Sequence, residues 1–355
     1  MTESVAPPAG SRRPRTAPAL ATALVLVLAA CGGTSTGAGS SGGAGSSGGA
    51  GSSSEAASPE ALTLYTCVSD TTIQPVLEAF EKSQPGSTVD LFRAPTGELN
   101  ARVAADVRSG GLRADVIWGC DPLTVQAFVD QGLVGGWTPP GADAIPTQYR
   151  TDDYVGAAVL YLVAVHRTDV PAPRAWSDLT GPDYTGAVAV PDPSVAASAL
   201  GALGWFAAAP GYGLDFYRDL KSNGAVQVKT PDDVTTGVAQ GIYDAGMTTA
   251  NAAYAARDDG SPVDVVWPEP GAVAIYGPVA LATHSADSQV AQDFISFVVG
   301  ADGQRVLGEA GSYPTRPGGA GPTVPADAPI VFPDWATIGQ SRDTILSSYQ
   351  QLFGG

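Results

Sequence analysis

The sequence predicts an α/β protein in which two α/β units are joined by long crossing strands. Short apolar runs typical of strands alternate with segments whose apolar residues recur at the spacing of a helical face. Residues 154–165 form a long apolar stretch and residues 273–282 a further strand, and two units joined by long crossing strands fit this pattern better than one very large sheet. About 295 residues follow the N-terminal tail, and 44% of the chain is hydrophobic, which suffices for two medium-sized domains.

Three strand–helix pairs open the first unit, and this order predicts a parallel sheet with helices on both faces. In the second helix, Leu99, Val103 and Val107 form an apolar stripe that we expect to face the core. The expected strands are 61–65, 88–92 and 114–118, and the helices after them contain the face Ile73, Val76, Leu77 and Phe80, the stripe 99–107, and residues 121–132.

The second unit repeats the alternation before the chain returns to the first. We expect strands 187–190, 225–228, 245–249 and 273–282, and helices over 194–206, 213–222, 232–241, 250–257, 288–299 and the last 20 residues. This assigns residues 61–160 and about 274–315 to the first lobe, and 161–273 to the second. Residues 316–355 are expected to form a loop and a helix that packs on the lobes.

The first 60 residues have the features of a targeting signal followed by a tether. Residues 1–30 combine a basic region with a short apolar run, and Leu28-Ala29-Ala30-Cys31 resembles the lipobox of bacterial lipoproteins. Residues 31–60 begin with the cysteine that would carry the lipid and continue as a Gly/Ser-rich tether, which is too polar to form a core. The alternative is an ordinary secretory signal with a chance cysteine.

Charge and composition exclude several classes of function. The net charge of −17 repels phosphate backbones, so no nucleic-acid partner is expected. Two histidines and three cysteines leave no basis for a His-rich or Cys₄ metal site. Neither histidine has a spaced partner, and no nucleophile elbow or Walker loop is present, so we expect no enzyme and no cofactor. Acidic pairs such as Asp232-Asp233 are interpreted as helix caps.

One helix start has the chemistry of an anion site. Residues 190–198 combine the end of a strand, a turn with two prolines, and small hydroxyl residues at the expected helix N-terminus. Free N–H groups and the helix dipole favour an anion at such a place. Ser194 as a simple N-cap is the alternative explanation.

Several segments together resemble one family of transport proteins. They are 62–66, 92–98, 114–118, 176–179, 186–193, 277–280, Gly303-Gln304 and 313–316. In this order they resemble the periplasmic solute-binding proteins of ABC importers, of the ferric-iron, 2-aminoethylphosphonate, polyamine and thiamine type. The resemblance implies two lobes of the type II periplasmic-binding-protein fold, each with a doubly wound sheet, with crossing strands between them and a ligand cleft. It also implies that the protein is extracytoplasmic and is anchored to the outer face of the membrane only through the lipid on Cys31. Its partners would be an ABC permease and the ATPase of that permease. We expect the protein to be a monomer.

The carboxyl ends of the strands would line the cleft, as in other open α/β sheets. On the first wall we expect Tyr65, Thr66, Ser69, Thr96, Gly97, Glu98 and Trp118. On the second wall we expect Ser194, Ala196, Ser198, Asn251 and Tyr254.

The favoured ligand is a small anionic or zwitterionic solute with a phosphonate, phosphate or carboxylate group. Its anion would lie at residues 194–198, and an amino group would face Glu98, Tyr65 or Trp118. Ferric iron is the alternative, with Tyr254 as the remaining phenolate ligand, although the adjacent tyrosines of the iron-binding members are replaced by Ala250 and Asn251. An extracytoplasmic sensor or an enzyme on the same fold is a further alternative.

A disulfide is expected between Cys67 and Cys120. Each lies two residues beyond the end of a strand, and in the sheet order 2-1-3 these two strands are neighbours. Adjacent strands lie about 4.7–4.9 Å apart, close to the Cα spacing of a disulfide, and the compartment is oxidising. Free thiols that bind a soft metal are the alternative.

We predict that Cys31→Ser releases the protein from membranes, because this thiol is the site of acylation. Fractionation of cells followed by N-terminal mass analysis tests this. The wild-type protein should partition with membranes and begin at a lipidated Cys31. An unlipidated N-terminus at another residue would contradict the prediction.

Overall fold

The computed structural model describes residues 60–354, so the signal segment, Cys31 and the tether lie outside the described residues. The strands are β1 (Glu60–Thr66), β2 (Ser87–Arg93), β3 (Val116–Trp118), β4 (Val155–Arg167), β5 (Val188–Pro191), β6 (Val226–Val228), β7 (Ala245–Thr249), β8 (Val263–Val266), β9 (Ala272–Leu281), β10 (Tyr313–Pro314) and β11 (Ile330–Val331). The α-helices are α1 (Asp70–Ser83), α2 (Thr96–Arg108), α3 (Pro122–Asp130), α4 (Ala197–Ala208), α5 (Gly213–Ser222), α6 (Pro231–Ala239), α7 (Ala250–Asp258), α8 (Gln289–Val299), α9 (Ala301–Glu309) and α10 (Trp335–Phe353).

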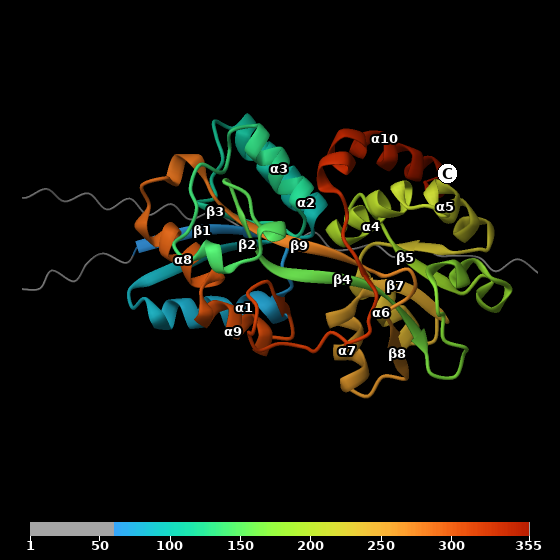
Figure 1. The fold of residues 1–355 in the computed structure, drawn as a ribbon. Coiled ribbons are helices and arrows are strands. Elements are labelled where there is room, and N and C mark those ends of the chain that lie inside the picture. The colour runs from blue at the N-terminus through green and yellow to red at the C-terminus, as the bar shows by residue number, and fades with distance from the viewer. Residues whose placement is uncertain (1–59, 355) are drawn as a thin grey trace, which may run out of the picture. The chain divides into compact units, whose positions relative to one another are not determined.

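The two long strands β4 and β9 pair antiparallel in the middle of the described chain (Figure 1). Their register runs from Val155 opposite Val279 to Leu162 opposite Val273, with a bulge after Gly156. Every residue of β9 is buried, as expected for a strand with neighbours on both sides and helices on its faces. This pair connects the two lobes.

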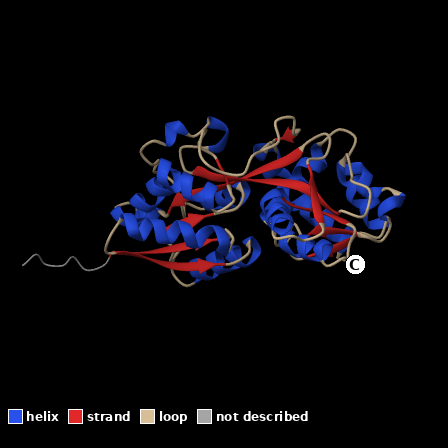
Figure 2. Ribbon diagram, turned by 90° about the horizontal axis from the view of Figure 1, so that it is seen from below, coloured by secondary structure: helices blue, strands red, loops and turns tan. Residues whose placement is uncertain are grey.

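Each lobe adds three parallel strands to one end of this pair. In the first lobe the order is β2-β1-β3, and β3 pairs with β9. In the second lobe the order is β7-β5-β6, and β7 pairs with β4. Helices cover both faces of these strands (Figure 2). The predicted two-lobed α/β fold is therefore confirmed, and the sheets of the two lobes are continuous through β9 and β4.

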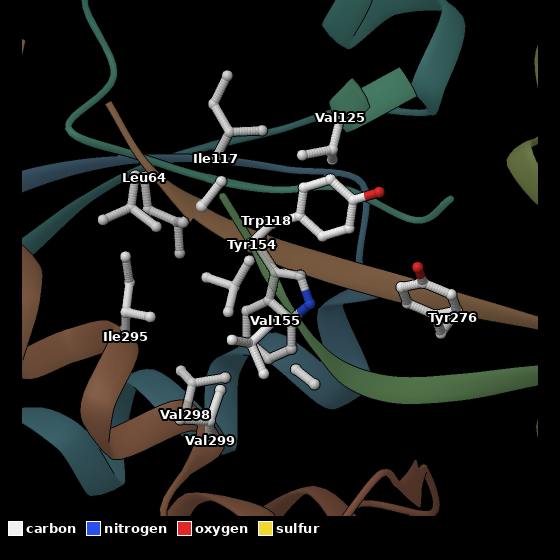
Figure 3. Packing of buried hydrophobic residues seen from close by; sticks show 14 of the residues in the cluster. Leu64, Ile117, Trp118, Val125, Tyr154, Val155, Tyr276, Ile295, Val298 and Val299 are labelled. Atoms are coloured by element: carbon white, nitrogen blue, oxygen red, sulfur yellow. The ribbon is translucent and has the colours of Figure 1, made fainter. Parts of the chain in front are cut away.

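The core of the first lobe is built around Trp118, which is 1% exposed. Figure 3 shows its indole among the side chains of Ile117, Tyr154 and Val155. A separate apolar cluster in the second lobe contains Trp176 and Phe206, whose rings meet edge to face. Each lobe thus has its own core.

The C-terminal helix α10 packs against α4 and α5 in the second lobe and also contacts α3 in the first. Leu123 of α3, Leu200 of α4 and Ile338 of α10 form one small apolar cluster. Gly204 of α4 permits this approach, because a Cβ there would lie 2.5 Å from Ile338 Cγ2.

Two local predictions are wrong. The sequence predicts that Val107 is the third inward-facing residue of α2, but its side chain is 41% exposed. Asp106, which is 4% exposed, faces inward instead. The Asp106 carboxylate is accommodated because it accepts a hydrogen bond from Tyr65 Oη at 2.8 Å and lies 3.2 Å from Arg102 Nε. Helix α4 begins at Ala197 rather than at residue 194, because Asp192 holds residues 194–196 in a turn.

Cys67 and Cys120 are joined in the structure, with their Cα atoms 5.9 Å apart. The bridge links the segments that follow β1 and β3, two paired neighbours in the sheet. It closes a loop between residues separated by 53 positions in the sequence.

We predict that Cys67→Ser combined with Cys120→Ser lowers the free energy of unfolding by about 4 kcal/mol, the chain-entropy value for a loop of this size. Urea unfolding of the oxidised protein measures the loss. Cys31→Ser is the matched control and should leave the unfolding curve unchanged. The Cys31→Ser chain should also show no reactive thiol when it is denatured without reductant, and two reactive thiols would contradict the bridge.

Candidate functional site

The register of the long strands makes the carboxyl ends of the two lobes face each other. β3 pairs with the 279–281 end of β9 and points toward residue 277, while β7 pairs with residues 162–166 of β4 and points toward residue 160. Since β4 and β9 are paired, both directions converge on the middle of the same ladder. The helices that follow these strands therefore begin around one space, as expected where ligands bind in open α/β sheets.

A cavity of about 150 Å³ occupies this space. Its floor consists of Ala158, Leu160 and Gly277, from the middle of β4 and β9. The first lobe adds Cys67, Val68, Ser69, Thr72, Arg93, Pro95, Thr96, Trp118, Gly119, Cys120, Leu307 and Ser312. The second lobe adds Val195, Ala196, Ala197, Ser198, Thr230, Pro231, Asp232, Thr249 and Asn251. A cavity of about this volume accommodates a molecule the size of benzene, so the site suits a small solute.

Helix N-termini dominate the walls. The N-cap residues of helices α1, α2, α4 and α7 line the cavity, and none of the four makes a side-chain hydrogen bond to a backbone N–H of its helix. Helix α6 also begins there, but Thr230 caps it. Each helix start carries a partial positive charge of about half an elementary charge, and the N–H groups of a first turn have no partner within their own helix. In α2, the N–H of Gly97 already donates to the carbonyl of Val195. The walls thus favour an anion.

Arg93 and Asp232 are the charged side chains among the lining residues. Arg93, at the end of β2, donates from Nε to the carbonyl of Val68 at 3.0 Å, and its Nη1 lies 3.8 Å from Asp70. Asp232 belongs to the first turn of α6 on the other wall and is exposed to solvent. Desolvation raises the pKa of Asp232, whereas the charge of Arg93 lowers it and that of Asp233 raises it.

Asn251 adds an unsatisfied polar group. Its Oδ1 is buried and has no hydrogen-bond partner within residues 60–354. Such an atom is costly to leave without a partner inside a protein. Because Asn251 lines the cavity, a ligand is in a position to supply the missing donor.

The structure brings six of the predicted wall residues to the cavity. They are Ser69, Thr96, Trp118, Ala196, Ser198 and Asn251. Trp118 is also part of the first-lobe core, so it contributes both to the packing of that lobe and to the cavity wall. Ser198 is 4% exposed and lies in the first turn of α4.

Three predicted residues from the first wall, Tyr65, Thr66 and Glu98, do not line the cavity. The Tyr65 hydroxyl donates to Asp106 on the far side of its strand, and burial raises the pKa of this phenol. The Thr66 hydroxyl donates to the carbonyl of Trp118 at 2.9 Å. Glu98 forms an exposed ion pair of 2.8 Å with Lys229, so its charge is already matched.

Three more predicted residues also lie outside the lining. Gly97 contacts the opposite lobe directly, with its N–H 3.3 Å from the carbonyl of Val195. The Ser194 hydroxyl donates to Asp192 at 2.7 Å and caps no helix. The Tyr254 hydroxyl accepts from Trp267 Nε1 at 2.9 Å.

Sequence reasoning missed Arg93, Asp232 and the start of α6. Arg93 lies directly after a predicted strand, at the edge of the sheet where ligands bind, so the sequence position alone could have indicated a ligand-binding residue. The sequence pattern groups Asp232 with Asp233 as a helix cap, but only Asp233 has that role: its Oδ2 accepts from the N–H of Thr230 at 2.9 Å. The start of α6 reaches the cavity because β6 is parallel to β5, and this pairing is not visible in the sequence.

Within residues 60–354, no group of three or more His, Cys, Asp or Glu side chains is arranged to hold a metal ion. None of the helices in this part of the chain has the length and apolar character needed to span a membrane.

Comparison with known proteins gives one family for most of the chain. The family of bacterial extracellular solute-binding proteins matches residues 62–312. The sulfate-binding protein of Synechococcus elongatus is 27% identical over 334 residues, which cover 90% of this chain and 87% of that protein. The spermidine/putrescine-binding periplasmic protein of Escherichia coli is 27% identical over 171 residues, 46% of this chain and 48% of that protein, so that match spans about half of each.

Solved structures share the fold. The periplasmic binding protein AfuA of Actinobacillus pleuropneumoniae, with fructose-6-phosphate bound, has a TM-score of 0.76 at 18% identity, covering 83% of this chain and 99% of its own. Iron-bound HitA of Pseudomonas aeruginosa has a TM-score of 0.71 at 18% identity, covering 82% of this chain and 99% of its own. At these identities the similarity concerns the fold alone.

We predict that Gly97→Ala separates the two lobes without unfolding them, because the added Cβ would lie 2.9 Å from the carbonyl oxygen of Ser194 in the opposite wall. Spin labels at two exposed positions, Val107 in α2 and Val226 in β6, measure the separation in a Cys31→Ser chain. The mean distance between the labels should increase. Gly319→Ala, where the Cβ would meet only ordinary contacts of 3.5 Å or more, is the control. An unchanged distance in the Gly97 variant would contradict the prediction.

Proposed function

Because the chain belongs to the family of bacterial extracellular solute-binding proteins, we propose that it captures a small anionic or zwitterionic solute between its lobes and delivers it to the permease of an ABC importer. The solute carries a phosphonate, phosphate or carboxylate group. The observation that carries this proposal is the cavity, where four helices without side-chain caps and the guanidinium of Arg93 converge.

Electrostatics support an oxyanion as the bound group. The chain as a whole has a net charge of −17, so a positive site has to be built locally. Helix N-termini provide it through oriented N–H donors that do not have to move when the ligand binds. Arg93 adds a full charge and a planar pair of donors that matches a phosphonate or carboxylate.

The similar proteins bind ligands of several kinds. One is a sulfate-binding protein, and AfuA holds fructose-6-phosphate, so oxyanion groups occur among these ligands. Others are a spermidine/putrescine-binding protein and an iron-bound protein. The choice among these classes therefore rests on the cavity of this chain.

Ferric iron has less support from the cavity. No tyrosine is among its lining residues, and the Tyr254 hydroxyl is already hydrogen-bonded to Trp267. Hard Fe³⁺ prefers anionic oxygen ligands, of which the lining provides only the carboxylate of Asp232.

The transport role also determines the expected partners and location. We infer a lipid anchor on Cys31 that holds the protein at the outer face of the membrane, where the permease and its ATPase form the importer. The Gly/Ser-rich sequence 32–54 separates this cysteine from the lobes. The protein acts as a monomer and as a carrier rather than an enzyme.

We predict that the protein is stabilised by an oxyanion solute and that Ser198→Asp abolishes this effect. A ligand at 100 times its dissociation constant adds about 2.7 kcal/mol to stability, so thermal unfolding with 2-aminoethylphosphonate, phosphate, sulfate, spermidine, thiamine and Fe³⁺ identifies the class. An aspartate in the first turn of α4 suits the helix dipole, so the fold should persist while the anion is repelled.

Ser288→Asp, at the N-cap of α8, is the matched control and should leave binding unchanged. Arg93→Gln should weaken the same ligand by about tenfold or more, the usual scale for a charge-assisted contact. Stabilisation by Fe³⁺ or spermidine alone would contradict the proposal.

A further inference from the structure

The cavity contains two hydrogen-bond acceptors to which no described residue donates. One is the buried Oδ1 of Asn251. The other is the carboxylate of Asp232, which is exposed to solvent and takes part in none of the side-chain hydrogen bonds or ion pairs described for residues 60–354. They lie on the same wall, in the first turns of α7 and α6.

Asp232 has no evident task within the fold. Its neighbour Asp233 caps α6, accepting from the N–H and the hydroxyl of Thr230 at 2.9 and 2.8 Å, and Thr230 Oγ1 accepts from the N–H of Asp233 at 3.2 Å. The capping interaction is therefore complete without Asp232. The charge of Arg93 on the facing wall acts on this carboxylate, but the two side chains form no ion pair within 4.0 Å, so both remain available to a ligand.

We propose that Asp232 makes the site selective for oxyanions that also carry a hydrogen-bond donor, namely an ammonium group or an acidic proton. The inference rests on the proposed function and adds the chemical class of the ligand. Arg93 and the helix N-termini hold the anionic group, while Asp232, supported by Asn251, accepts from the donor.

The selectivity follows from what a carboxylate is able to do. An ionised aspartate only accepts hydrogen bonds, so it pairs with a donor and opposes a second anion that offers acceptors alone. Rejection of this kind, by an unpaired like charge, is a common source of specificity. A zwitterion or a protonated phosphate satisfies both walls, whereas sulfate or a simple sulfonate leaves Asp232 facing another acceptor.

Two ligand pairs isolate the donor. Phosphate keeps a proton at neutral pH and sulfate does not, although the two are similar in size and shape. Taurine and ethanesulfonate share a permanently charged sulfonate and differ in the ammonium group. Isothermal titration of the purified protein with all four gives two preference ratios, and we expect phosphate and taurine to bind about tenfold tighter than their partners.

Asp232→Asn retains the shape of the side chain and removes the charge. We expect Asp232→Asn to reduce both affinity ratios, phosphate over sulfate and taurine over ethanesulfonate, to about threefold or less. The phosphate/sulfate ratio should fall because sulfate binds more tightly to the variant. Asp233→Asn is the matched control and should keep the wild-type ratios. Asp232→Ser is a second variant, in case the amide itself forms a new contact, and should give the same loss of preference.

The outcomes separate this inference from the function on which it rests. Oxyanion binding with ratios unchanged in Asp232→Asn and Asp232→Ser would overturn the role of Asp232 and leave the proposed function intact. Binding of these anions to the wild-type protein with no preference would overturn that role in the same way. Absence of binding of all four anions to the wild-type protein would overturn the proposed function and the inference together.

Discussion

The antiparallel pairing of β4 with β9 is the constraint on which the rest of the structure depends. These two strands belong to both lobes, and their register determines where β3 and β7 are attached and in which direction they point. It also places Ala158, Leu160 and Gly277 at the floor of the cavity. A slip by one residue would turn every side chain of the ladder to the opposite face, so the core and the site are specified by the same hydrogen bonds.

Beside this ladder, several polar groups of the fold face a cavity. They are four helix starts without side-chain caps, the unpaired amide oxygen of Asn251 and the solvent-exposed carboxylate of Asp232. Groups of the same kinds also occur elsewhere in residues 60–354: α5, α8 and α9 have no side-chain cap, and Asn100 Oδ1 and Tyr349 Oη are buried without a partner. The groups at the cavity differ from these because they lie beside a space that a ligand can occupy.

The sequence predicted the fold well because apolar periodicity and turn residues report local structure directly. The alternation of strands and helices follows from such signals. The order β2-β1-β3 and the proximity of Cys67 to Cys120 follow from the general topology of doubly wound sheets. Details failed where a polar contact overrode the pattern. Asp106 replaces Val107 on the inner face of α2 because Tyr65 and Arg102 satisfy it, and the same interaction turns Tyr65 away from the cavity. The role of Asp232 depends on which of two adjacent carboxylates caps the helix, and composition does not distinguish them.

The position of α10 affects the order in which the protein matures. Strand β3 gains its inner neighbour only when β9 has been made, well over a hundred residues later. Helix α10, which packs on α3, α4 and α5, comes later still and is the last helix among the described residues. A nascent chain therefore lacks parts of both lobes until β9 and α10 have been made. For a member of an extracellular family, this delay is useful, because a polypeptide that has not yet folded remains competent to be threaded through a secretion channel.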